Sequence, residues 1–151
     1  DLTRMTVQEL LSLRAGIERE LSDRGLSGAI GDIGERLAIE HFAKRADLPV
    51  LAPAPRGAKN IDAISRDGRR YSIKTLMKAR KTGTVYPEPG DENYQMFEYM
   101  LIVLVSDECE LQKIYRLSWK DFLTVRSWDR RMNAWYVPRS AKVFALAEDL
   151  T

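Results

Sequence analysis

Cysteine and histidine are almost missing from this sequence of 151 residues, in which Cys109 and His41 are the sole examples. A single cysteine cannot form a disulfide within the chain or a thiolate metal cluster, and the N-terminus lacks the apolar core of a secretory signal. A lone histidine is more often structural or exposed than catalytic. We therefore expect a cytoplasmic, reducing environment, and neither residue is a site candidate. Because the chain opens on Asp1 rather than Met, the sequence leaves open a leader or an upstream domain.

Long apolar runs are missing too, since no segment approaches the roughly 18 consecutive apolar residues that a membrane span requires. We therefore expect no membrane partner. The length suits one domain over residues 1–151, able to bury a core without disulfides or metals. A strong excess of either charge is also absent, because 24 Lys and Arg stand against 22 Asp and Glu, which gives a formal net charge of +2. The overall charge by itself says little about partners.

Positive charge is nevertheless concentrated in one stretch of the sequence. Between Arg66 and Lys81 there are seven basic residues and one acid, Asp67. Such a local excess suits a polyanion such as nucleic acid, although a solvated hairpin and loop would explain it equally well. The residues that we predict to contact nucleic acid are Lys59, Lys78, Arg80 and Lys81.

A helix is predicted near the N-terminus. Thr6-Val7-Gln8-Glu9 has the capping-box pattern, in which the Thr6 hydroxyl and the Glu9 carboxylate satisfy exposed amides. Leucine and isoleucine then recur at helical spacing. The helix should run from about residue 6 to about residue 23 and stop at Gly25.

A second helix is predicted to begin near Ser27 and to end at about Lys44, before Pro49. Three glycines, Gly28, Gly31 and Gly34, fall within its first half. Because glycine weakens a helix by about 1 kcal/mol relative to alanine, they need a reason such as close backbone packing or ligand access.

The pattern changes from helical to extended after a connector over residues 49–55. Ile61 to Ser65 and Arg70 to Leu76 predict two strands, and Met77 to Gln95 predicts a long irregular loop. The segment from Tyr99 to Val105 is continuously apolar and rich in β-formers, which is typical of a strand buried on both faces. We expect it at the centre of the sheet.

The C-terminal third predicts shorter elements. Leu111 to Leu117 should pair with the central strand, either antiparallel or after a crossover, and Ser118 can cap a short helix that reaches Val125. Trp135 to Val137 and Lys142 to Leu146 are predicted as edge strands. The fold class is therefore α/β, a mixed sheet flanked by helices.

Two charged residues occupy positions that a strand would normally give to its core. Asp62 lies between apolar residues on one predicted strand, and Lys74 lies between apolar residues on the next. Cross-strand neighbours lie about 5 Å apart, so the two can share a site. A two-residue turn at Asp67-Gly68 would put them on opposite faces of the sheet, whereas a three-residue loop, Arg66-Asp67-Gly68, would put them on one face. An active site here therefore requires the three-residue loop.

These residue types match the chemistry of phosphodiester hydrolysis. A hard cation such as Mg²⁺, for which Mn²⁺ can substitute, takes oxygen ligands, commonly one or two carboxylates together with waters and a phosphate oxygen. It stabilises charge on the phosphate and makes a bound water more acidic. A lysine orients the attacking water, or acts as a base if its pKa is lowered. Asp62 is the natural metal ligand and Lys74 the natural catalytic lysine.

Together with Gly31-Asp32-Ile33-Gly34-Glu35, the segments Ile61-Asp62-Ala63 and Ser72-Ile73-Lys74-Thr75 resemble the PD-(D/E)xK nuclease superfamily, which has the restriction-endonuclease-like fold. The resemblance covers residues 28–105. It implies that Asp62 is the principal metal ligand, Lys74 the catalytic lysine and Glu35 a helical carboxylate of the site, and that the Ile73 carbonyl is a further metal ligand.

Ser72 departs from that pattern, because the family has Glu, Asp or Gln two residues before the lysine. A hydroxyl is a weaker metal ligand than a carboxylate. Three explanations are open: Glu35 supplies the missing charge, which we favour; Ser72 binds metal through water; or catalysis is impaired.

The resemblance implies a Mg²⁺-dependent endonuclease that acts on DNA, and a homodimer is plausible because cutting both strands commonly calls for two active sites. The first alternative is a nuclease-fold module that binds nucleic acid without cutting it. The second is a structural or regulatory domain whose basic hairpin contacts a protein. For an Asp and a Lys taken alone, a simple salt bridge between Asp62 and Lys74 would be the favoured explanation.

Overall fold

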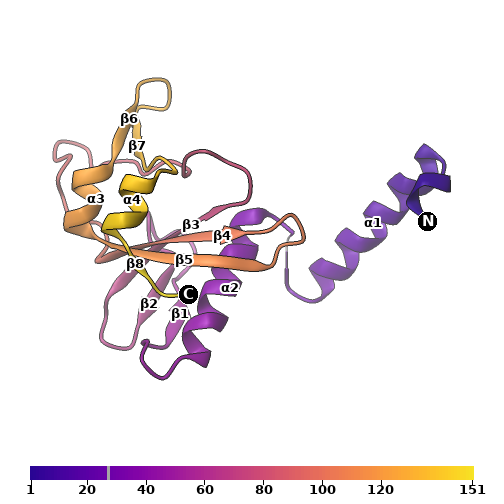
Figure 1. The fold of residues 1–151 in the computed structure, drawn as a ribbon, viewed down its shortest axis with the longest axis horizontal. Coiled ribbons are helices and arrows are strands. Elements are labelled where there is room, and N and C mark those ends of the chain that lie inside the picture. The colour runs from indigo at the N-terminus through magenta and orange to yellow at the C-terminus, as the bar shows by residue number, and fades with distance from the viewer. Residues whose placement is uncertain (27) are drawn as a thin grey trace.

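The centre of the fold is a mixed six-stranded sheet with the order β1-β2-β3-β4-β5-β8 (Figure 1). The computed structural model describes residues 1–26 and 28–151. The pairs β1–β2, β2–β3, β4–β5 and β5–β8 are antiparallel, and β3–β4 is parallel. The strands of this sheet are β1 (Leu51–Pro53), β2 (Ala63–Ser65), β3 (Arg70–Leu76), β4 (Tyr99–Val105), β5 (Leu111–Ser118) and β8 (Glu148–Asp149).

In residues 1–26 and 28–151, the remaining elements are a short 3-10 helix, four α-helices and a small second sheet. The helices are η1 (Leu2–Arg4), α1 (Val7–Asp23), α2 (Ile30–Lys44), α3 (Trp119–Val125) and α4 (Ala141–Leu146). The second sheet is an antiparallel hairpin of β6 (Ser127–Asp129) and β7 (Ala134–Tyr136). None of the helices in the described residues is long and apolar enough to cross a membrane.

Strand β4 is buried on both of its faces, as its continuous apolar sequence predicts. Met100, Ile102 and Leu104 contribute to one hydrophobic cluster. Leu101 and Val103 belong to the other. Because successive side chains of a strand point to opposite faces, one strand divides the core into two layers.

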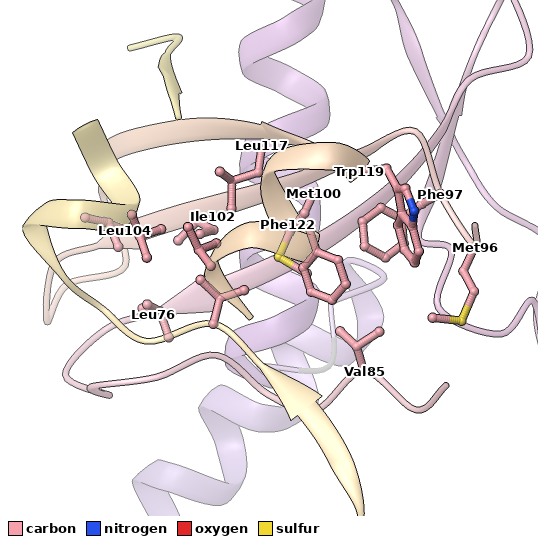
Figure 2. Packing of buried hydrophobic residues seen from close by; sticks show 13 residues of the cluster. Leu76, Val85, Met96, Phe97, Met100, Ile102, Leu104, Leu117, Trp119 and Phe122 are labelled. Carbon is pink, nitrogen blue, oxygen red and sulfur yellow. The ribbon is translucent and has the colours of Figure 1, made fainter. Parts of the chain in front are cut away.

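The first layer packs against α3 and α4. Figure 2 shows Leu76, Met100, Ile102, Leu117 and Phe122 gathered on one side of the sheet. Phe122 is fully buried, as is Leu117. Ser118 caps α3 by accepting a hydrogen bond from the Asp121 amide at 3.2 Å, which confirms the predicted start of that helix.

The second layer packs against α2. Ala38 and Phe42 from the helix lie over Tyr71 and Ile73 of β3. The rings of Phe42 and Tyr71 meet edge to face, with centroids 5.8 Å apart. This layer fixes α2 over the strand that carries Lys74, and it therefore positions one side of the candidate site.

Helix α1 stands away from the sheet (Figure 1). Its start is as predicted, because the Thr6 hydroxyl accepts a hydrogen bond from the Glu9 amide at 3.1 Å. None of its described residues is buried, and Leu10, Leu13 and Ile17 remain 37%, 41% and 52% exposed. The apolar stripe that predicts this helix therefore does not serve the core of the sheet.

The second helix departs from the prediction at its start. Ser27 lies outside the described residues, and α2 begins at Ile30. Gly28 has φ +80° and precedes the helix, so it is not one of the helical glycines. Close packing explains Gly34, whereas a Cβ at Gly31 would meet nothing within 4 Å.

Other predicted boundaries need correction. The connector over residues 49–55 contains β1, a short edge strand that its prolines and alanines do not indicate. The strand predicted at Trp135 to Val137 is β7, and it lies in the small hairpin rather than at the edge of the main sheet. The strand predicted at Lys142 to Leu146 is wrong, because this segment belongs to helix α4, capped by Ser140. Valine and phenylalanine favour a strand in this segment, but the Ser140 cap and the packing of Val143 in the core stabilise a helix.

Candidate active site

The β2–β3 hairpin has the three-residue loop that the candidate site requires. Ala63 pairs with Tyr71. The Ser65 amide donates to the Arg69 carbonyl at 2.9 Å, so residues 66–68 form the loop. Gly68 has φ +82°, a conformation that glycine adopts without steric cost. The strand β2 begins at Ala63 and not at the predicted Ile61, so Asp62 lies directly before it. The loop and its register leave Asp62 beside the β3 segment that carries Lys74.

Asp62 is held against β3 by its own side chain. Its Oδ2 accepts a hydrogen bond from the Ile73 amide at 2.7 Å. Its backbone amide donates to the Tyr71 carbonyl at 2.8 Å. A carboxylate that accepts from a backbone amide is fixed in direction as well as in position. Asp62 therefore cannot swing freely into solvent.

Glu35 reaches this carboxylate because α2 approaches β3 unusually closely. A Cβ built on Gly34 would lie 2.6 Å from the Cβ of Thr75, so alanine cannot be accommodated there without a shift. Glycine at this position lets the helix backbone descend onto the strand. The next residue of the helix, Glu35, then hydrogen-bonds with Asp62. Gly34 thus provides the close approach expected from the glycine-rich segment.

The Glu35 carboxyl has a strongly altered acidity. Burial and the neighbouring Asp62 carboxylate raise the pKa of Glu35 from 4.5 to about 7, and Asp32 one turn earlier adds to the rise. Two carboxyl groups this close favour holding a proton between them. Without a cation, Glu35 is therefore only partly ionised at neutral pH. This is the response expected of ligands that are gathered for a positive ion.

Lys74 is half-buried on β3, and burial lowers its pKa, although the carboxyls of Asp62 and Glu35 oppose the change. Its Nζ donates to the Thr84 carbonyl at 3.1 Å. No ion pair within 4.0 Å joins Lys74 to either carboxylate among the described residues. The simple salt bridge between Asp62 and Lys74 is therefore not formed, and the ammonium is positioned by the long loop after β3 instead.

Ser72 takes no part in this network. It is fully buried, and its Oγ has no hydrogen-bond partner in the described part of the chain. A buried hydroxyl without a partner is costly, by about 1–3 kcal/mol. The side chain that departs from the family pattern is thus also a side chain that the local structure does not satisfy.

The donor set fits a hard divalent cation. Asp62 and Glu35 offer carboxylate oxygens close together. A strand residue points its N–H and C=O to the same edge, and the Ile73 amide points to Asp62, so its carbonyl is directed to the same side. Across residues 1–26 and 28–151, no group of three or more His, Cys, Asp or Glu side chains could hold a metal ion. One or two carboxylates completed by water and substrate oxygens is a common arrangement for Mg²⁺.

An open groove of about 620 Å³ runs beside Glu35. Asp32, Ile39 and Glu40 line it from α2, and Arg56 lines it from the connector after β1. Arg56 is exposed, and the pattern of the sequence does not single it out. Its guanidinium gives the groove positive charge beside the carboxylates, where a phosphate could approach.

The four basic residues predicted to contact nucleic acid do not form one group. Lys78 pairs with Asp107 at 3.5 Å, and Lys81 pairs with Asp129 of β6 at 3.3 Å. Arg80 lies between them and is exposed. Lys59 lines a separate groove of about 150 Å³ beside Arg70, in which none of the other three takes part.

Sequence reasoning missed two further features. The first is the Thr84 carbonyl, which holds Lys74 and has no signal in the sequence because any residue provides a carbonyl. The second is a basic stretch from Arg126 to Lys142, with Arg130 and Arg131 at its centre and one acid, Asp129. Its charge could have been noticed. No protein-family model matches the sequence, and no curated protein matches it at a significant level.

Proposed function

We propose that this chain is a Mg²⁺-dependent endonuclease of the restriction-endonuclease-like type that hydrolyses phosphodiester bonds of DNA. The observation that carries the proposal is the meeting of Asp62 and Glu35 beside Lys74, with the pKa of Glu35 raised to about 7 and that of Lys74 lowered. Structural charges seldom need such an arrangement, whereas perturbed titratable groups are common in active sites. The mixed sheet with its flanking helices supports the proposed fold type.

Asp62, Glu35 and the Ile73 carbonyl would hold the cation. When bound, Mg²⁺ or Mn²⁺ stabilises charge on the scissile phosphate and makes a coordinated water more acidic. The hydrogen bond from the Ile73 amide keeps Asp62 in place. As a ligand, Glu35 would be in its deprotonated form, and its pKa of about 7 puts that form within reach at neutral pH.

Lys74 would position the attacking water and offset negative charge as the phosphorus–oxygen bond to the leaving group breaks. The Thr84 carbonyl accepts a hydrogen bond from the Lys74 ammonium and restricts its direction. Because burial lowers its pKa, the neutral amine is easier to reach than for an exposed lysine, and it can also take a proton from the water. Water attacks the phosphate directly, so no covalent enzyme intermediate is needed.

The test is cleavage of supercoiled plasmid DNA with Mg²⁺ or Mn²⁺. Wild-type protein should nick or linearise the plasmid, and chelation of the cation should stop it. Asp62→Ala and Lys74→Ala should each reduce the rate by about a hundredfold or more. Asp23→Ala and Lys120→Ala are matched controls, because both residues are exposed and far from the site in sequence.

Circular dichroism should show that all four variants are folded. Cleavage that survives both site substitutions would refute the assignment, and so would loss of cleavage in the two controls. Asp62→Ala also shows whether the cleavage comes from this protein, because the activity of a contaminating nuclease would not depend on Asp62.

A specific observation supports a second candidate, a nuclease-fold module that binds nucleic acid without cutting it. Ser72 stands where the family has a carboxylate or glutamine, and its buried hydroxyl offers no charge to a cation. Salt-dependent DNA binding without cleavage under any divalent cation would favour this candidate.

Double-stranded DNA and a homodimer remain parts of the proposal. Two active sites are needed to cut both strands in one encounter, and a symmetric dimer provides them. Sedimentation of the chain with and without a duplex measures the number of copies. If the protein is a monomer that nicks one strand, the proposed nuclease activity is retained and the proposed homodimer is refuted.

A further inference from the structure

The β6–β7 hairpin projects from the body of the protein on the side of α3 and α4 (Figure 1). Its loop is formed by residues 130–133, closed by the pairing of Asp129 with Ala134. The Asp129 carboxylate accepts from the Met132 amide at 3.0 Å, and Asn133 has φ +55°, so the loop has a defined shape. The hairpin is therefore a small two-stranded ribbon, and the loop at its tip is held in one conformation.

Positive charge at the tip of this ribbon is uncompensated. Arg130 and Arg131 are exposed, and within the described residues their guanidinium groups have no hydrogen bond or ion pair. The neighbouring acid, Asp129, is already paired with Lys81. Apolar surface lies beside the charge, because Met132 is 40% exposed and Trp128 is 39% exposed. Charge and apolar surface together suit a nucleic-acid groove, which has phosphates at its rims and bases at its floor.

The ribbon is joined to the loop that positions Lys74. Val85 and Trp135 of β7 exchange two backbone hydrogen bonds, at 2.7 and 2.9 Å. Thr82 and Val137 are also bonded twice, through the Thr82 amide at 2.9 Å and the Thr82 hydroxyl at 3.0 Å. Thr84, whose carbonyl holds Lys74, lies between these two attachments. The ribbon is therefore hydrogen-bonded, on both sides of Thr84, to the loop that holds the candidate lysine.

We propose that the β6–β7 ribbon enters the major groove of a DNA duplex, with Arg130 and Arg131 on phosphates and Met132 against base edges. The major groove is about 12 Å wide and admits a two-stranded β-ribbon, whereas the minor groove is about half that width. Arginine binds phosphate through two hydrogen bonds at once. This inference rests on the proposed function, because it supplies the duplex that the candidate site would cut.

Binding is measured first, without cleavage, so that the two proposals can fail separately. Full-length protein and a fluorescent duplex are titrated in chelator at several salt concentrations. Arg130→Ala/Arg131→Ala should weaken binding about tenfold at moderate salt and reduce the slope of log affinity against log salt by about two. Arg4→Ala/Arg19→Ala is the matched control, because both arginines are exposed near the N-terminus. It should bind like the wild type.

Each result has a defined meaning. Unchanged affinity of Arg130→Ala/Arg131→Ala, beside a wild type that binds, overturns the ribbon while leaving the nuclease proposal untouched. If the variant loses binding and the wild type never cleaves DNA, duplex binding by the ribbon is supported and the nuclease proposal is refuted. A wild type that binds no duplex at any salt overturns the ribbon and assigns this surface to another class of partner.

Groove choice is tested by methylation of the bound duplex with dimethyl sulfate. Guanine N7 faces the major groove, so wild-type protein should protect it at a few positions. The Arg130→Ala/Arg131→Ala variant, at a concentration that restores occupancy, should protect it less. Full reactivity of every guanine N7 in the wild-type complex overturns entry into the major groove.

Discussion

Two hairpins in this molecule differ in how far their functional charged side chains are buried. At the base of the β2–β3 hairpin Asp62 and Lys74 are half-buried beside Glu35 of α2. The pKa of Glu35 rises to about 7 while that of Lys74 falls. In the β6–β7 hairpin, which projects from the body (Figure 1), Arg130 and Arg131 of the loop are exposed. Charged side chains therefore meet different dielectric surroundings at the two hairpins.

The difference shows what burial contributes to function. A buried charge interacts strongly with its neighbours and changes its proton affinity, which suits bond making and breaking. An exposed charge is screened by salt and acts mainly through association with a polyanion. We therefore expect substitutions in the first hairpin to change catalytic rate, and those in the second to change affinity.

The largest effect should follow from Asp62→Asn. This change keeps the size of the side chain but removes the negative charge next to the Ile73 amide. The cleavage rate constant at saturating DNA should fall about a thousandfold, whereas Arg130→Ala/Arg131→Ala should raise KM about tenfold with little change in rate at saturation. Single-turnover cleavage measures both. If the arginine variant cleaved slowly even at saturating DNA, the assignment of catalysis to the first hairpin and of affinity to the second would be wrong.

Gly34→Ala should have the next largest effect, on stability. The added methyl would meet the Thr75 side chain on β3, and overpacking of this kind costs about 1–3 kcal/mol. Urea unfolding measures the free energy. Gly31→Ala is the matched control on the same helix, since its Cβ would meet nothing within 4 Å, and it should stabilise the helix by about 0.5–1 kcal/mol.

A double variant, Gly34→Ala/Thr75→Ala, tests the cause. Removal of the Thr75 hydroxyl and methyl frees part of the space that the new Cβ needs, so the loss of stability should be partly restored. Equal destabilisation by Gly31→Ala and Gly34→Ala would mean that close approach of α2 to β3 does not decide the effect.

Glu35→Gln should change stability in a direction that depends on pH. The pKa of Glu35 is about 7 in the folded protein against 4.5 ordinarily, so ionisation is harder in the folded state. The contribution of Glu35 to the stability of the metal-free wild type is fully present below pH 4.5 and is lost as pH rises through about 7. Glutamine cannot ionise, so at pH 8 without metal the variant should be more stable by about 1 kcal/mol, a value discounted for partial exposure.

Thermal unfolding at pH 5 and pH 8 in chelator checks this sign. The variant should unfold about 2–4 °C higher at pH 8 and close to the wild type at pH 5. Mn²⁺ should reverse the order by stabilising the wild type alone. A variant that is less stable than the wild type at pH 8 without metal would contradict the origin of the raised pKa.

Sequence predicted the strand that carries Lys74 from its local pattern, whereas it left a two-residue and a three-residue loop before this strand both open. Arg70 to Leu76 has strand periodicity, and Gly68 permits the left-handed end of a three-residue loop. Tyr99 to Val105 was equally clear, since only a strand buried on both faces remains apolar throughout.

The parts that sequence did not predict depend on distant contacts. The elevated pKa of Glu35 comes from helix packing at Gly34, and the direction of Lys74 comes from the Thr84 carbonyl. Segment 142–146 was predicted as a strand because its residues have β-propensity, but Ser140 caps a helix there. Tertiary packing and capping override propensity at such short segments.

Lys81→Met should have the smallest effect, and it separates a paired cation at this hairpin from the unpaired arginines of its loop. Lys81 is paired with Asp129 at 3.3 Å, but its side chain is 54% exposed, so the pair should contribute less than about 1 kcal/mol to stability. Because its charge is already opposed by Asp129, its loss should weaken duplex binding less than loss of either Arg130 or Arg131. Titration of the same duplex at one salt concentration compares the three single substitutions. If Lys81→Met weakened binding most, the contact with DNA would be centred on Lys81 and not on Arg130 and Arg131.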